Sequence, residues 1–343
     1  MTDGPYDRKV QLTGGTTYTV SLPKDWATEQ SVDIGDRVRL YDRGDRLLVT
    51  QPDADADRRT VSIPAASRSP EAVARTLTAA YLTGAERVRV EGAPDRDTRA
   101  AVEAAVGGLV GIEIAEESEA TIVARSMLDV GDLSPKQTVT QMVNMALRMH
   151  EDALTAALDG DGDAGDRVRD RDDTVDRLFG LIAREFQRSL VDARVDGAAG
   201  ELTTFDYYTT ARQVERVADH AVRMGEAAEP IESPPPELAA ELRRVGADAR
   251  RVVDRAVSET LNGGGPDVLG DVLIEGSDVV AETDRLDRSL HDRTLDDGYA
   301  LATVLDAITR TAEYGINVAE AGLQAAIRDS RTEAVSEANG TTP

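Results

Sequence analysis

The chain has 343 residues, a length that favours two or three domains, and it contains no cysteine. The lack of cysteine excludes a disulfide framework, a thiolate nucleophile and a cysteine metal site. Aromatic residues make up only 3% of the sequence, which argues against stacking platforms for single-stranded nucleic acid. The 64 acidic and 39 basic side chains give a formal net charge of −25.

This acidity does not indicate disorder, because the hydrophobic content of 41% is near that of ordinary globular proteins. An acidic, cysteine-free composition rich in Ala, Asp and Arg is typical of a salt-accumulating cytoplasm. A basic partner is the alternative explanation. No apolar run approaches the roughly 18 residues of a membrane span, and no signal segment opens the chain. We therefore expect a cytoplasmic protein without direct membrane insertion.

The charge is distributed unevenly along the chain. Residues 1–50 carry seven basic and eight acidic side chains, a net charge of −1. Residues 51–130 have a net charge of −5, and residues 131–343 have −19. A near-neutral N-terminal head therefore precedes a very acidic body.

The head, residues 1–50, is expected to form short strands. A brief helical stretch should follow Pro23, a residue that helices tolerate at their first position. Four strands this short cannot bury a sufficient core alone, so we expect the head to dimerise. The predicted strands are 9–12, 16–22, 38–41 and 47–50.

The strings RKVQLTGGTTYTVSLPKDW and VDIGDRVRLYDRGDRLLV give the head a resemblance to the SpoVT/AbrB family. This resemblance implies a swapped-hairpin β domain that forms an intertwined homodimer. It also implies DNA binding through Arg8, Lys9 and Lys24. The alternative is a module for dimerisation or docking only, because three basic residues make a small phosphate-binding footprint. Molar salt, with a Debye length of about 3 Å, would weaken such contacts further.

Residues 58–128 are expected to form a small α/β domain of order βαβαββ. The predicted strands and helices are 60–64, 70–84, 87–91, 95–107, 111–115 and 120–124. The glycines near residue 108 lack a neighbouring lysine, so they do not form a phosphate-binding loop of known pattern. This domain is therefore interpreted as a structural spacer, with a small-molecule sensor as the alternative.

The remainder, residues 134–330, is expected to be an all-α body, followed by a disordered tail at 331–343. Apolar residues recur every three or four positions, and the intervening breaks carry Gly, Pro, Asp and Asn. Long helices joined by short loops favour a bundle. The six predicted helical segments are 134–159, 164–194, 201–229, 235–261, 266–294 and 298–330.

The body is also an internal repeat, with halves at 134–229 and 235–330. The string ERVADHAVRMGE, which starts at Glu215, aligns without gaps to TRTAEYGINVAE, which starts at Thr309. Acidic pairs on the middle helix of each half align as well. We therefore expect two tandem three-helix bundles.

The string ERVADHA and the repeated acidic segments give the body a resemblance to the PhoU family. This resemblance implies a regulator of phosphate uptake and phosphate-starvation signalling that contacts a phosphate-transporter ATPase or a phosphate-signalling protein. Some members hold metal ions on their carboxylate faces. An AbrB-like head before a PhoU-like body also resembles an archaeal arrangement, so a halophilic archaeon is the expected source.

Carboxylates spaced four residues apart give a metal site partial support, and this support does not depend on the resemblance. Two such pairs on neighbouring helices would offer hard oxygen donors for a divalent metal or iron. The candidate ligands are Asp172, Asp173, Asp176, Glu215 and Asp219 in the first half, and Asp284, Asp287 and Glu313 in the second. In the second half Thr309 stands where the first half has Glu215, which puts that site in doubt.

The alternative is that these acids are solvated and paired with Arg171, Arg177 and Arg216, because carboxylate pairs arise often by chance in so acidic a chain. His220 would support the metal site indirectly, whereas His150 and His291 are expected at surface or boundary positions. No Ser/His/Asp arrangement appears in a motif context, so the sequence does not indicate an enzyme.

Three functions therefore stay open: a phosphate-signalling adaptor, a DNA-binding transcriptional regulator whose helical body acts as a sensor, and a metal-binding or scaffold protein unrelated to phosphate.

Overall fold

The structure is a computed structural model, and it divides the chain into two units, residues 1–58 and 59–343, which are described separately. Side chains are not described for residue 42, for 164–165 or beyond 328. The residues described are 5–42, 47–50, 60–128, 134–160, 164–190, 202–231, 234–293 and 295–340.

The first unit contains two antiparallel hairpins and one short helix, α1 (Lys24–Glu29). Strand β1 (Gln11–Thr13) pairs with β2 (Thr17–Thr19), and β3 (Arg39–Asp42) pairs with β4 (Leu47–Thr50). Gly14 and Gly15 have φ angles of +63° and +79°, a left-handed conformation that suits the tight turn between β1 and β2. The four expected strands are present, but the loop at 43–46 lies outside the described residues.

No residue of the described part of this head is buried. Its aliphatic and aromatic side chains instead face outward on both hairpins. The most exposed of them are Val10, Leu12, Tyr18, Val20, Ile34, Leu40 and Leu47. Over its described residues, the head of a single chain therefore has no hydrophobic core of its own.

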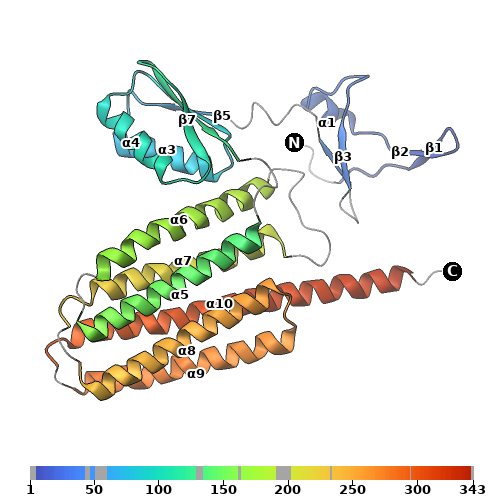
Figure 1. The fold of residues 1–343 in the computed structure, drawn as a ribbon. Coiled ribbons are helices and arrows are strands. Elements are labelled where there is room, and N and C mark those ends of the chain that lie inside the picture. The colour runs from blue at the N-terminus through green and yellow to red at the C-terminus, as the bar shows by residue number, and fades with distance from the viewer. Residues whose placement is uncertain are drawn as a thin grey trace. The chain divides into compact units, whose positions relative to one another are not determined.

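The second unit begins with the α/β domain, whose order βαβαββ confirms the expected one. Its sheet has the order β5-β6-β8-β7; β5 and β6 are parallel, and the remaining pairs are antiparallel. Helices α3 and α4 pack together over one face of this sheet (Figure 1). The elements are β5 (Thr60–Pro64), α3 (Pro70–Leu82), β6 (Arg87–Glu91), α4 (Arg96–Gly107), β7 (Ile112–Glu117) and β8 (Thr121–Ser126).

Six long helices form the rest of the second unit (Figure 1). Each loop falls at one of the expected Gly-, Pro- or Asp-rich breaks. No helix in the described ranges is long and apolar enough to cross a membrane. The helices are α5 (Pro135–Asp159), α6 (Ala164–Ser189), α7 (Thr204–Glu226), α8 (Pro236–Leu261), α9 (Pro266–His291) and α10 (Gly298–Gly340).

Helix α10 continues well past residue 330, where we had expected a disordered tail. The chain between Leu323 and Asn339 contains neither glycine nor proline, and it is rich in Ala, Glu and Arg. These residue types have high helix propensity, so no local signal ends the helix before Gly340.

The body consists of two three-helix halves that meet through equivalent helices. Helix α5 contacts α8, and α7 contacts α10, so the first and third helices of each half pack on their counterparts. The ring of His220 meets the ring of Tyr314 edge-on, with centroids 5.4 Å apart, and these residues occupy aligned positions of the repeat. Contact between equivalent residues is the mark of a twofold relation. The two halves therefore share one hydrophobic core about a pseudo-twofold axis.

Candidate functional site: a carboxylate cluster on α6 and α7

The candidate metal ligands of the first half lie on two neighbouring helices. Asp172, Asp173 and Asp176 belong to α6, and Glu215 and Asp219 belong to α7, which packs against it. Helix α7 is fixed at its start by a capping box, in which the side chains of Thr203 and Asp206 bond each other's backbone N–H groups. The spacing of four residues places each acidic pair on one helix face.

These carboxylates act strongly on one another. Burial raises the pKa of Asp172 to about 7, and the nearby charges of Asp176, Asp219 and Asp173 contribute to that rise. Burial also raises the pKa of Glu215 to about 7, with Asp219 adding to the effect and Arg212 opposing it. Partial burial also raises the pKa of Asp176, and the charges of Asp219 and Asp173 add to that rise. The structure thus brings the five predicted acids of the first half into one electrostatic cluster.

Two oxygens of this cluster lack a hydrogen-bond partner. Oδ1 of Asp172 and Oε2 of Glu215 are buried, and neither is bonded within the described structure. The other oxygen of Glu215, Oε1, accepts a hydrogen bond of 2.9 Å from Nη1 of Arg212. Buried carboxylate oxygens without donors are costly, and a hard cation would satisfy them. Oxygen donors of this kind are the ligands that hard cations such as Mg²⁺, Mn²⁺ or iron prefer.

The cluster is not arranged as a finished coordination sphere. Over the described ranges, no group of three or more Asp, Glu or His side chains is positioned to hold a metal ion. Asp173, Asp176 and Asp219 are exposed, whereas Glu215 is buried, so the acids lie at different depths. A bound cation would require the exposed side chains to turn inward toward Asp172 and Glu215.

The predicted ligands of the second half have different surroundings. Asp284 and Asp287 are exposed on α9. Oε2 of Glu313 accepts a hydrogen bond of 2.8 Å from Nη1 of Arg310. The hydroxyl of Thr309, at the position of Glu215, donates to the backbone carbonyl of Leu305 at 2.9 Å. Among described residues, buried carboxylate oxygens without partners occur only in the first half.

Two of the arginines that the alternative interpretation pairs with these acids, Arg171 and Arg216, have other partners in the structure. Arg171 forms an ion pair with Asp152 of α5, and Arg216 lies over the ring of Tyr314, 5.8 Å from its centroid. The arginine that contacts the cluster is Arg212, one helical turn before Glu215. The sequence contained this signal, because a spacing of three residues on a helix places the two side chains side by side.

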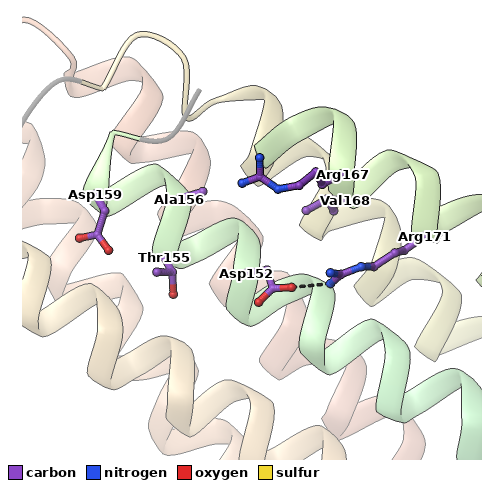
Figure 2. A pocket seen from close by; sticks show the side chains of 7 residues that line it. All are labelled: Asp152, Thr155, Ala156, Asp159, Arg167, Val168 and Arg171. Carbon is purple, nitrogen blue, oxygen red and sulfur yellow. Dashed lines mark hydrogen bonds and ion pairs between the residues drawn. The ribbon is translucent and has the colours of Figure 1, made fainter. Parts of the chain in front are cut away.

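A shallow pocket of about 350 Å³ lies between α5 and α6. Figure 2 shows Arg167 and Arg171 of α6 on one side and Asp152 and Asp159 of α5 on the other, with Arg171 paired to Asp152. Asp159 also accepts a hydrogen bond of 2.6 Å from Arg243 of α8. The pocket is thus walled by mutually compensated charges.

The histidines occupy three different environments. His220 is 8% exposed and its Nδ1 lies 3.0 Å from the backbone carbonyl of Arg216, while His291 is on the surface as expected. The expectation for His150 was wrong, because this side chain is completely buried. Helix α5 contacts α6, α7 and α8, so its buried face is wider than a single stripe. Arg250 donates to Nδ1 of His150 at 3.3 Å.

The predicted DNA-contacting residues of the head, Arg8, Lys9 and Lys24, are all exposed. The Arg8 guanidinium donates to the backbone carbonyl of Asp7 at 3.0 Å and lies 5.5 Å from the centroid of the Tyr6 ring.

Two parts of the chain are similar to known protein families. Residues 139–228 match the model of the PhoU domain family. Residues 11–55 match the model described as antidote-toxin recognition MazE, bacterial antitoxin. No curated protein matches the chain. The chain thus contains a PhoU domain preceded by a MazE/AbrB-like domain.

Solved structures agree with the fold of the body. The crystal structure of PhoU from Pseudomonas aeruginosa is similar, with a TM-score of 0.50 and 20% identity, over 56% of this chain and 94% of that one. The phosphate transport system regulatory protein PhoU from Streptococcus pneumoniae gives a TM-score of 0.49 and 13% identity, over 56% and 92%. The likeness to the Pseudomonas aeruginosa structure shows that the helical body has the PhoU fold.

Proposed function

We propose that this protein regulates phosphate uptake and phosphate-starvation signalling in the cytoplasm through contact with other proteins. The observation that carries the proposal is the match of residues 139–228 to the PhoU domain, within a body of two equivalent three-helix halves. The expected partner is a phosphate-transporter ATPase or a phosphate-signalling protein. Long helical faces rich in charge suit such a docking role.

Deletion of the gene tests this function directly. Phosphate uptake and the expression of phosphate-starvation genes would be measured in cells grown with abundant and with scarce phosphate. The deletion strain should express starvation genes even when phosphate is abundant, and a plasmid copy of the gene should restore repression. An unchanged response to phosphate in the deletion strain would exclude the adaptor role.

A divalent metal or iron bound by the first-half cluster is part of the proposal. Asp172 and Glu215 would be its inner ligands, because their buried oxygens Oδ1 and Oε2 lack donors. Asp173, Asp176 and Asp219 would complete the oxygen set. A cation there would neutralise charges that repel across α6 and α7, and so hold the two helices together at their exposed face.

Elemental analysis of protein purified without tags or chelators tests the metal. Glu215→Ala combined with Asp219→Ala should remove most of the bound metal. The matched control is Asp284→Ala combined with Asp287→Ala, which removes two exposed acids from the equivalent helix pair and should leave the metal content unchanged. Metal below one-tenth of the protein concentration in the unmutated chain, or equal loss in both variants, would contradict the site.

DNA binding by the head is the second candidate function. It is favoured by the MazE/AbrB-like match at 11–55 and by the exposure of Arg8, Lys9 and Lys24. In this case the helical body would act as the sensor. Arg8→Ala with Lys9→Ala should abolish a sequence-specific complex with promoters of phosphate genes at native salt, whereas Arg177→Ala in the body should not. Failure of the unmutated protein to bind those promoters would count against this function.

A homodimer formed through the head completes the proposal. The head of one chain buries none of its described residues, although it carries many exposed apolar side chains. A second copy would supply the missing half of a core, as expected for a domain of this size.

A further inference from the structure

The N-terminal half of α5 exposes a surface that carries no acidic side chain. Residues 133–150 contain neither Asp nor Glu, and this is the longest such run in a chain with 64 acidic residues. An open groove of about 790 Å³ lies along this part of the helix, and its described lining comes from α5 and its N-cap alone. We call it the α5 groove. Its polar side chains include Lys136, Gln137, Gln141, Asn144 and Arg148.

The lining residues follow one face of α5. Their spacing of four, three and four residues, from Gln137 through Gln141 and Asn144 to Arg148, places side chains on the same side of a helix. All four are exposed. The other side of α5 is buried where the helix contacts α6, α7 and α8. The groove therefore lies on the free face of a helix that is otherwise fixed in the core.

The polar groups of the α5 groove have few partners within the chain. Nδ2 of Asn144 donates to the backbone carbonyl of Thr140 at 2.8 Å, and Nζ of Lys136 donates to Oδ1 of Asn262 at 2.9 Å. Amide side chains both donate and accept hydrogen bonds, so they can bond a second protein without a change of charge. Within the described residues, no side-chain hydrogen bond or ion pair is formed by Gln137, Gln141 or Arg148.

The equivalent helix of the second half has a different surface. Helix α8 exposes Glu237, Glu241 and Asp254. A surface free of acids is therefore not a general property of the first helix in a half. Uncharged amides are also scarce, because the chain has only eight Gln and four Asn, yet three of these twelve line the α5 groove.

This surface differs in charge from the body that surrounds it. Residues 131–343 have a net charge of −19, so the body as a whole repels an acidic protein. Lys136 and Arg148 lie about 18 Å apart along the helix axis and place a positive charge near each end of the groove. Farther along α5, each acid is paired with an arginine of a neighbouring helix; these acids are Glu151, Asp152 and Asp159.

We infer that the α5 groove is the docking surface for an acidic segment of the partner protein. Carboxylates of that segment pair with Lys136 and Arg148, and its polar groups bond the amides of Gln137, Gln141 and Asn144. Contact at this face brings no acid of the regulator against an acid of the partner. The inference rests on the proposed function, because it names the face through which the regulator contacts its partner.

Gln137→Glu combined with Gln141→Glu tests the docking surface with almost no change in side-chain shape. Each substitution adds a negative charge to the groove, so the variant should lose repression of phosphate-starvation genes in abundant phosphate, as the deletion strain should. The matched control is Gln187→Glu combined with Gln324→Glu, which adds the same charge at exposed positions of α6 and α10 and should keep repression. Immunoblots and thermal unfolding check that both variants accumulate and fold like the unmutated chain.

The outcomes separate this inference from the proposed function. Normal repression in the groove variant, together with derepression in the deletion strain, would overturn the docking surface and leave the proposed function standing. Equal derepression by the two double variants would overturn it as well. A deletion strain with a normal phosphate response would refute the proposed function, and the docking surface with it. The purified groove variant should keep its mass in light scattering, whereas a lower mass would assign the groove to a second copy of the chain and overturn the inference.

Mutations that restore repression to the groove variant test the charge of the partner. Genome sequencing of such strains should find an Asp or Glu of another protein replaced by a neutral or basic residue, because that change removes the new repulsion. Restoring mutations that alter only basic or uncharged residues of that protein would overturn the acidic segment.

Discussion

At the scale of single residues, His150 is the clearest departure from what its position in the sequence suggested. It is fully buried in α5, with Arg250 of α8 donating to its Nδ1 and His220 of α7 nearby. Arg250 in turn lies 3.5 Å from Glu151. Because arginine only donates hydrogen bonds, His150 must accept at Nδ1 and be neutral in the folded protein.

His150 should make a contribution to the free energy of unfolding that is lost in mild acid. Burial, together with the charges of Arg250 and His220, lowers its pKa to about 3 from an ordinary value of 6.5. Below pH 6.5 the unfolded chain takes up a proton that the folded chain does not. The contribution of His150 to stability is therefore complete above pH 6.5 and falls by about 1.4 kcal/mol per pH unit as the pH drops toward the folded pKa. Asp172 and Glu215, whose pKa values are raised to about 7, act in the opposite direction over this range.

His150→Gln keeps a hydrogen-bond acceptor for Arg250 but cannot titrate. In urea unfolding, the free energy of unfolding of the unmutated chain relative to this variant should fall by about 1.4 kcal/mol per pH unit as the pH drops from 6.5 to 5. His291→Gln, at an exposed position, is the control and should retain the original slope. Parallel slopes for all three proteins would show that His150 does not remain neutral on folding.

At the scale of elements, α10 lies close to the backbone of α8 at Gly315. A Cβ atom there would lie 3.0 Å from the backbone nitrogen of Val253 and 2.8 Å from Cγ1 of Val252. A backbone atom cannot turn away as a side chain can, so the two helices would have to separate. The aligned residue of the first half is Ala221, which shows that the two halves are not packed identically.

Gly315→Ala should lower the free energy of unfolding by about 1–3 kcal/mol, the usual cost of overpacking. Gly270→Ala on α9 is the matched control, because no heavy atom lies within 4 Å of the Cβ position there. That change should stabilise the helix by up to about 1 kcal/mol. Chemical denaturation of both variants measures the difference, and a stabilising Gly315→Ala would contradict the close approach.

Helix and strand positions were largely predictable from the sequence, because apolar periodicity and Gly- or Pro-rich breaks are local signals. The contacts that the side chains make between distant parts of the chain were less predictable. Arg184 and Arg188 carry no local signal of burial, yet both are buried, and the end of α3, about 100 residues earlier in the chain, contacts them. The acidic cluster was predictable because its members repeat at helical spacing, but its depth depends on how α6 packs on α7.

At the scale of the whole molecule, we expect the head to govern association. Its two hairpins expose apolar side chains, with Leu12 at 59% and Leu40 at 62%, and a single chain buries none of the described ones. Leu12→Asp should therefore convert a dimer into a monomer without unfolding the second unit, because the added charge cannot be buried between two copies.

Light scattering coupled to gel filtration measures this change. The control is Ile274→Asp on α9, an equally exposed apolar residue of the body at 63%, which should leave the dimer intact. A monomeric unmutated chain, or a dimer that survives Leu12→Asp and dissociates in Ile274→Asp, would move the association from the head to the body.

The pseudo-twofold relation between the two halves bears on how many partner molecules one chain can bind. The two halves meet through equivalent helices, yet among the described residues the buried carboxylate oxygens without partners lie only in the first half, and Arg310 is paired with Glu313 in the second. A partner that recognises the α6–α7 face should therefore bind once per chain, and the dimer should bridge two partner molecules rather than four.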